Sequence, residues 1–290
     1  MLNSAILMMF LYSNFVSSTD VEDSTEFQEK IYKGKDVLRK GVYPYFCSIQ
    51  IPNDRYPYIH YCGGVLVERN VMLTAAHCLT NTSLISKLRI LPNYRNRRVI
   101  QKSDPIIKVK NYVIHPDFLK QRPYSMHDIA VVLLDKPDTR PKATLQLAFR
   151  RLPVNTKVKL IGFGIEIRDY LSDALLEATV TIKDDKKCLD EKTGFEYAPI
   201  YNFCTQNNVG AGGCYGDAGG PAIWQDARTN ISYLYGVLSS EQSPCNKFHT
   251  DVFVNVFAHL KFINDAYLQF SREQFGCPKT RKAEITEYDY

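Results

Sequence analysis

The amino-acid sequence predicts an all-β protein whose chain closes with one helix. Short runs rich in Val, Ile, Leu and aromatic residues recur along the chain, and Gly, Pro, Asn and Asp separate them, as in antiparallel sheets. Only the segment Asn255–Arg272 carries apolar residues at helical spacing. Of the 290 residues, 45% are hydrophobic and 23% are charged, which is ample apolar material for a folded core.

The expected elements follow one another without an internal repeat. The helix is expected to bury one side, formed by Val256, Leu260, Ile263, Tyr267 and Leu268. The runs expected to form strands are Tyr45–Ile51, Gly64–Val67, Val71–Thr74, Ile129–Leu134, Lys157–Phe163, Tyr233–Leu238 and Val252–Val256.

The N-terminal residues 1–18 are uncharged and contain one apolar block, Ala5–Leu11, before the small residues Ser17 and Ser18. This pattern predicts a secretory signal peptide, and a short buried helix is the alternative. Residues 19–30 hold five acidic residues and one Lys, which predicts a removable acidic pro-segment or a disordered leader. No stretch of the sequence is long and apolar enough to span a membrane.

Three motifs occur in one order along the body of the chain: Leu73–Cys78 (LTAAHC), His127–Leu134 (HDIAVVLL) and Cys214–Pro221 (CYGDAGGP). Together they resemble the His, Asp and Ser motifs of the chymotrypsin-like serine proteases. Supporting matches are Cys62-Gly63-Gly64, Gly162-Phe163-Gly164 and Ile31-Tyr32-Lys33-Gly34.

The resemblance covers about residues 31–270 and implies the fold of that family. We therefore expect two six-stranded antiparallel Greek-key β-barrels, formed by about residues 31–150 and 151–255, with the C-terminal helix completing a domain at residues 31–272. Residues 273–290 are expected to form a disordered tail.

The resemblance also implies roles for individual residues. His77 matches the general base, and Asp128 matches the buried carboxylate that orients it. Gly216 matches the glycine whose backbone N–H contributes to the oxyanion hole. Ala218 stands where the family has its nucleophilic serine, and a methyl group cannot attack a carbonyl carbon.

Further departures surround the same site. The family's Ser-Trp-Gly substrate strand becomes Ser239-Ser240-Glu241, which places a charged side chain at the mouth of the specificity pocket. The floor of that pocket falls on Gly212, so we expect no acid there to receive Lys or Arg. These departures favour natural loss of catalysis over an engineered Ser→Ala change. A replacement nucleophile is the remaining possibility, with Ser239 and Ser240 as its candidates.

The start of the family-like region implies activation by proteolysis. Lys30 precedes an Ile-x-x-Gly sequence, so we expect a trypsin-like protease to cut between Lys30 and Ile31. In the family, the new α-amino group pairs with the acid next to the serine, which is Asp217 here.

Eight cysteines in a secreted chain predict disulfides, although spacing alone leaves about 105 pairings open. The resemblance implies three of these bonds. Three states are open to the two remaining cysteines, Cys47 and Cys277: a bond to each other, the reduced form, or a bond to another chain. The three implied pairs are Cys62–Cys78, Cys188–Cys204 and Cys214–Cys245. Asn81 and Asn230 begin Asn-x-Ser triplets and are candidate glycosylation sites.

The segment Lys87–Lys110 holds eight basic residues and one acidic residue. Such a segment suits an acidic protein, a sulfated glycan or a membrane surface, and the alternative is a solvated strand face, since Lys108-Val109-Lys110 alternates. We find no pattern that indicates a cofactor, a metal ion or nucleic acid.

The sequence thus predicts a secreted, catalytically inactive serine protease homologue that acts by binding. As partners we expect extracellular proteins, namely a protease, its substrate or its inhibitor, with the protein as cofactor, decoy or regulator of a protease cascade. A serine endopeptidase with an engineered Ser→Ala change and a polyanion-binding or antimicrobial protein are the alternatives.

Overall fold

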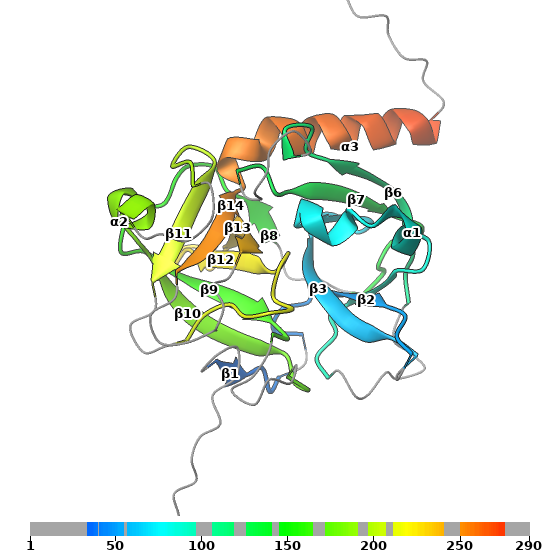
Figure 1. The fold of residues 1–290 in the computed structure, drawn as a ribbon, viewed down its shortest axis with the longest axis horizontal. Helices are drawn as coiled ribbons and strands as arrows, with labels where there is room; N and C mark the ends of the chain where they lie inside the picture. The colour runs from blue at the N-terminus through cyan, green and yellow to red at the C-terminus, as the bar shows by residue number, and fades with distance from the viewer. Residues whose placement is uncertain are drawn as a thin grey trace, which may run out of the picture.

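The computed structural model describes residues 34–39, 41–54, 57–96, 106–118, 126–140, 145–164, 172–190, 197–206, 211–240 and 250–275. The predicted signal peptide, the pro-segment and the end of the tail lie outside these residues. Two β-sheets lie side by side, and one long helix runs across both (Figure 1).

The first sheet has six strands, and all of its neighbouring pairs are antiparallel. Among the described residues, a single isolated bridge joins Ile90 of one edge strand to Ile107, which precedes the other edge strand, so the sheet forms a half-barrel where a fully closed barrel was expected. In spatial order the strands are β5 (Arg89–Pro92), β2 (Phe46–Ile51), β3 (Ile59–Leu66), β4 (Val71–Thr74), β7 (Ala130–Leu134) and β6 (Val109–Ile114).

The second sheet has eight strands, and six of them close into a barrel because β9 pairs with both β10 and β12. The closed strands are β9 (Lys157–Gly162), β10 (Leu176–Ile182), β11 (Asn202–Gln206), β14 (Asp251–Asn255), β13 (Ser232–Ser240) and β12 (Pro221–Gln225). The predicted fold class, an all-β chymotrypsin-like fold with a C-terminal helix, is confirmed.

Two short strands add to the second sheet from the part of the chain expected in the first. β1 (Lys35–Asp36) pairs with β10, and β8 (Leu145–Leu147) pairs in parallel with β13. The division at residue 150 is therefore only approximate. Strands of two or three residues carry too little alternation for the sequence to show which sheet they join.

The two sheets share one continuous apolar core. At their junction, the ring of Phe163 lies 5.8 Å from the ring of Phe46 and 5.7 Å from that of Tyr94, measured between centroids. All five residues of β7 are buried, which explains why this strand reads as a continuous apolar run.

The C-terminal helix begins later than predicted. Asn255 is the last residue of β14, and its side-chain oxygen accepts the backbone N–H of Phe257 at 3.1 Å. This bond starts the 3-10 helix η3 (Phe257–His259), which α3 (Leu260–Phe275) follows.

The predicted apolar side of the helix is correct only in part. Ile263, Ala266 and Phe270 are buried, whereas Tyr267 and Leu268 are 43% and 42% exposed. Other short helices are η1 (Ala76–Leu79), α1 (Thr82–Ile85) and α2 (Asp185–Asp190). Among the described residues, no helix has the length and apolar character needed to cross a membrane.

The disulfides Cys62–Cys78 and Cys188–Cys204 are confirmed. Cys214 is also disulfide-bonded, and its expected partner Cys245 lies outside the described residues, as does Cys277. Cys47 is buried in β2.

Candidate active-site region

The pairing of β4 with β7 brings His77 and Asp128 together. Thr74, at the end of β4, lies opposite Ala130, so the residues that follow one strand meet those that precede the other. His77 Nδ1 is 2.7 Å from Asp128 Oδ2, and the His77 backbone N–H donates to Oδ1 at 2.9 Å. The Asp128 carboxylate is fully buried and the His77 imidazole is 29% exposed, as expected for a general base that a buried carboxylate orients.

Ser239 contributes a third donor to the same carboxylate. Its hydroxyl, on β13 of the second sheet, donates to Asp128 Oδ2 at 2.8 Å. Because this proton is already committed to Asp128, the contact argues against Ser239 as a replacement nucleophile. The side chain of Ser240 and all of Glu241 lie outside the described residues.

The turn that carries Ala218 is held by hydrogen bonds from both sheets. The Gly63 N–H donates to the carbonyl of Ala218 at 2.7 Å, and the Gly219 N–H donates to that of Leu238 at 2.7 Å. Gly216 has a φ of 96°, a backbone conformation that favours glycine. Ala218 itself is buried, with 6% exposure, and offers only a methyl group.

Two residues that support this turn were missed in the sequence. The buried His60 places Nε2 at 2.8 Å from the Gly216 carbonyl, and its Nδ1 is 2.7 Å from Ser48 Oγ. In the tautomer that satisfies both bonds, Nε2–H donates to Gly216 and the Ser48 hydroxyl donates to Nδ1. No local signal exists, since His60 and Gly216 lie 156 positions apart.

Asp217 is fully buried and explains the Gly-Phe-Gly motif. Its Oδ1 accepts the Gly164 N–H at 2.7 Å, and its Oδ2 accepts the Cys214 N–H at 3.0 Å. A Cβ on Gly162 or Gly164 would lie 1.9 or 2.0 Å from a carboxylate oxygen of Asp217, so only glycine fits. Burial raises the pKa of Asp217 to about 7. No cation pairs with it among the described residues, and Lys30 and Ile31 lie outside them.

A second buried acid, Asp251, lies beside the expected pocket floor. The N–H of Gly213, next to Gly212, donates to Asp251 Oδ2 at 2.9 Å. Its other oxygen has no hydrogen-bond partner within the described part of the chain. Burial, and then the charge of Asp217, raise the pKa of Asp251 to about 7. The expectation of no acid concerned position 212 itself, which is Gly212, whereas Asp251 reaches the neighbouring Gly213 from β14.

Three of the five described cations of the basic segment have local partners, while Lys87 and Lys110 are exposed. The Arg89 guanidinium lies 3.9 Å from the centroid of the Tyr58 ring, and Lys108 Nζ donates to the Leu88 carbonyl at 3.2 Å. Arg95 donates to the Leu38 carbonyl at 3.3 Å. These contacts favour the strand-face interpretation for these three residues, while Arg97, Arg98 and Lys102 lie outside the described residues.

Both candidate glycosylation sites are accessible. Asn81 is exposed at the start of α1, and Asn230 is exposed in the turn between β12 and β13. Asn230 has a φ of 57°, which Asn adopts more readily than most residues.

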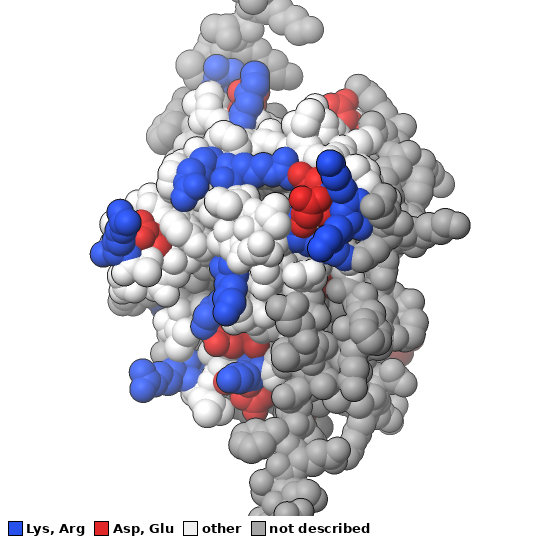
Figure 2. Space-filling model, turned by 90° about the vertical axis from the view of Figure 1, so that its left-hand side faces the viewer, with Lys and Arg blue, Asp and Glu red and all other residues white. Residues whose placement is uncertain are grey.

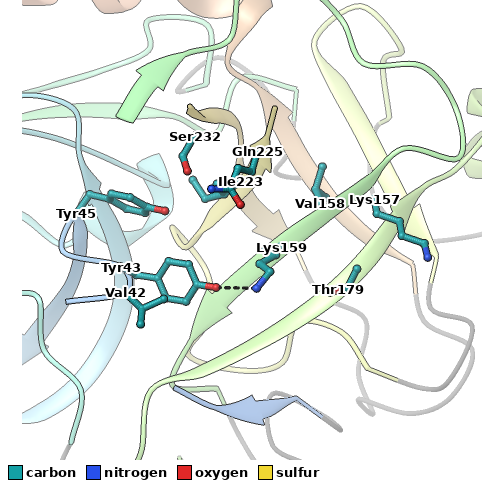
Figure 3. A pocket seen from close by; sticks show the side chains of 10 residues that line it. All are labelled: Val42, Tyr43, Tyr45, Lys157, Val158, Lys159, Thr179, Ile223, Gln225 and Ser232. Atoms are coloured by element: carbon teal, nitrogen blue, oxygen red, sulfur yellow. Dashed lines mark hydrogen bonds between the residues drawn. The ribbon is translucent and has the colours of Figure 1, made fainter. Parts of the chain in front are cut away.

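Figures 2 and 3 show parts of the molecule away from this region. On the face shown in Figure 2, Lys and Arg side chains are dispersed, with Asp and Glu between several of them. A hollow of about 300 Å³ is lined by residues of β9, β10, β12 and the approach to β2 (Figure 3). There Lys159 donates to the Tyr43 hydroxyl at 3.1 Å, and it also donates to Glu177 outside the lining at 2.8 Å, so the ammonium of Lys159 already has partners.

The half-barrel and barrel, with a His–Asp pair at their junction, define a chymotrypsin-like domain. A family model described as Trypsin matches residues 31–263, and the chain belongs to this family. It is 26% identical to "Ovochymase" of Halocynthia roretzi over 85% of this chain and 16% of that protein's length. It is 26% identical to "Venom peptide isomerase heavy chain" of Agelenopsis aperta over 80% of this chain and 98% of the relative. It is 30% identical to "Trypsin iota" of Drosophila melanogaster over 72% of this chain and 77% of the relative.

Proposed function

We propose that this protein is a secreted serine protease homologue without hydrolytic activity, which acts by binding an extracellular protein. The observation that carries the proposal is Ala218, which stands in the turn between Asp217 and Gly219 and supplies no oxygen to attack a carbonyl. In a protease with the same triad logic, loss of the serine lowers turnover by about 10⁶-fold.

Retention of the surrounding geometry supports a binding role. The His77–Asp128–Ser239 contacts and the His60 bond to Gly216 would keep the cleft ordered without chemistry. An ordered cleft of this fold suits an extended peptide of a protease, a protease substrate or an inhibitor.

Proteolysis between Lys30 and Ile31 is proposed as the switch for this binding. A new α-amino group that entered the site of Asp217 would neutralise a buried carboxylate that has no cation among the described residues.

The second candidate function is a serine endopeptidase in which an engineered Ser→Ala change removed the nucleophile. The observation that favours it is the intact donor set on Asp128, with all three contacts at 2.7–2.9 Å. A third candidate, polyanion binding through Lys87–Lys110, rests on charge alone.

Ala218→Ser, in the form that begins at Ile31, separates the first two candidates. We expect slow labelling by a small phosphonate probe, because His77 and Asp128 survive, but little hydrolysis of a broad peptide library. Positioning of substrate supplies about 7–11 kcal/mol of catalysis, and the Ser239–Glu241 strand departs from the family there. Ala218→Ser combined with Asp128→Asn is the matched control and should lose the labelling.

Two results would overturn the proposal. Stoichiometric labelling of the wild-type protein, verified by intact mass, would reveal another nucleophile. Peptide turnover by Ala218→Ser at the level of an ordinary digestive protease would favour the engineered endopeptidase.

A further inference from the structure

Three histidines converge where the C-terminal helical segment meets the first sheet. His115 follows β6, His127 precedes β7, and His259 ends η3. The His115 and His127 rings stack nearly parallel, at 7° and with centroids 4.4 Å apart, and the His259 ring meets both of them edge-on. The cluster therefore joins η3, and α3 after it, to the chain between β6 and β7.

Hydrogen bonds fix each of the three rings in one neutral tautomer. His259 Nδ1 is 2.7 Å from the carbonyl of Asn255, which can only accept, so Nδ1 carries the proton and Nε2 is bare. That bare nitrogen is 3.0 Å from His127 Nδ1, which therefore carries the proton that joins the two rings. His115 Nδ1 accepts the backbone N–H of Asp117 at 3.2 Å, so this nitrogen is bare as well.

Every position that is open to an added proton carries a cost. A proton on His259 Nε2 would face the Nδ1–H of His127 and break the bond between the two rings. A proton on His115 Nδ1 would remove the acceptor of the Asp117 N–H. The third position, His127 Nε2, belongs to a ring that is 8% exposed and that also packs on the phenol ring of Tyr201, with centroids 4.3 Å apart. The first two positions thus lose a hydrogen bond, and the third buries a positive charge.

The described acids near the cluster do not balance such a charge. Asp117 Oδ2 is 4.0 Å from His115 Nδ1, but this side chain is 47% exposed, so water screens it. The Asp128 carboxylate is committed to the imidazole of His77. On the α3 side, the cation and the acid that line the pocket of about 360 Å³ over the cluster form an ion pair with each other, Lys261–Asp265.

The resulting dependence on pH has a definite sign. Burial lowers the pKa of all three histidines from 6.5, to about 4 for His115 and His259, so the unfolded chain binds protons more tightly. The stability that the neutral cluster contributes is complete above pH 6.5 and is lost as pH falls from there through 4. For each histidine with a folded pKa near 4, the constant for closing the contact falls by about 20-fold between pH 7 and pH 5.

We propose that His115, His127 and His259 form an acid-sensitive contact, which holds η3 and α3 against the first sheet at neutral pH and opens when the cluster takes up protons. Because His127 directly precedes Asp128, opening also loosens the segment that orients His77. The sequence carried no sign of this contact, because its members are separated by 12 and 132 positions. The inference goes beyond the proposed binding function and does not depend on it.

Hydrogen exchange of the full chain at pH 7 and pH 5 tests the proposal. Mass spectrometry follows the exchange, and protection factors correct for the pH dependence of the intrinsic exchange rate. We expect the protection of the α3 amides to fall by at least about 20-fold at pH 5. Protection of β9 and β10 should not fall with it, because the raised pKa values of the buried acids Asp217 and Asp251 stabilise the second sheet as pH falls.

Two variants remove a titrating ring and keep its hydrogen bond. In His115→Asn the amide oxygen replaces Nδ1 as the acceptor of the Asp117 N–H, and in His127→Asn the amide nitrogen replaces Nδ1 as the donor to His259. We expect His115→Asn to reduce the pH dependence of α3 protection by about 20-fold or more, and His127→Asn to change it in the same direction. His77→Asn is the matched control, because His77 lies outside the cluster, and it should keep the pH dependence of the wild type.

The wild-type measurement keeps the test decisive if the variant of the buried His127 fails to fold, and the partly exposed His115 provides a second variant. Equal protection of α3 at pH 7 and pH 5 in the wild type would overturn the proposal. A loss of protection that β9 and β10 share in full would do the same, since the opening would then not be local. So would wild-type pH dependence in folded His115→Asn, or its loss in His77→Asn.

Discussion

The buried acid Asp251 makes the stability of this protein depend on pH in an unusual direction. Its carboxylate is fully buried, its Oδ2 accepts one N–H from Gly213, and its Oδ1 has no partner among the described residues. Asp251→Asn removes the ionisable group while it keeps the shape and the acceptor for Gly213. We therefore expect the substitution to destabilise the protein at low pH and to stabilise it at high pH.

The sign follows from the raised pKa. A folded-state pKa of about 7, against 3.8 in the unfolded chain, means that the folded state holds its proton more tightly. The stability contributed by the protonated group is complete below pH 3.8 and is lost as pH rises through about 7. The full loss is about 4 kcal/mol, at about 1.4 kcal/mol for each pH unit across that window.

The amide of Asp251→Asn has no such titration, but it buries an NH₂ group without a partner, which costs about 1–3 kcal/mol. At pH 4 only this cost remains, so the variant should be less stable than the wild type by that amount. At pH 8 the cost is offset by the avoided loss of about 4 kcal/mol, which leaves a net gain of about 1–3 kcal/mol.

Urea unfolding of the oxidised protein at pH 4 and pH 8, followed by fluorescence, measures both values. Asp226→Asn is the comparison variant, because its effect on stability should change with pH in the opposite direction. The backbone N–H of Arg228 lowers the pKa of this exposed group, so its stabilising contribution is present at high pH and is lost as pH falls. An equal change in stability for Asp251→Asn at both pH values would refute the assignment of a neutral buried acid.

Two further predictions concern Asp217. Gly164→Ala places a Cβ about 2.0 Å from Asp217 Oδ2 and should destabilise the fold by at least about 2 kcal/mol in thermal unfolding. Gly41→Ala is the control, because a Cβ there meets nothing within 4 Å although the residue has a φ of +80°. It should cost only about 1 kcal/mol of stability. An equal loss of stability in Gly164→Ala and Gly41→Ala would exclude the clash as the cause. Cleavage between Lys30 and Ile31 should yield a chain whose N-terminal sequence begins at Ile31 and whose resistance to further trypsin rises, because its ammonium pairs with Asp217. A secreted form that begins near Thr19 and resists trypsin at Lys30 would contradict this prediction.

Local patterns in the sequence were sufficient for the fold class. The alternation and turn residues of the strands act over a few positions, and the three motifs that contain His77, Asp128 and Ala218 are each shorter than ten residues. The Cys62–Cys78 and Cys188–Cys204 bonds followed from the family resemblance and are confirmed. The start of α3 was misplaced because Asn255 belongs to β14, whose long-range pairing with Gly236 overrides local helical spacing.

The sequence by itself determined that this chain has an all-β fold of the chymotrypsin type, and that position 218 holds a methyl group. Only the tertiary structure showed that Asp251 faces Gly213 from another strand and that His60 holds the Gly216 carbonyl. The same is true of the three-histidine cluster of His115, His127 and His259. The residues joined by these contacts are tens of positions or more apart in the sequence. The exception is the pair His115 and His127, which are 12 positions apart. Their register is set by sheet pairing and barrel closure, which no short window of sequence contains.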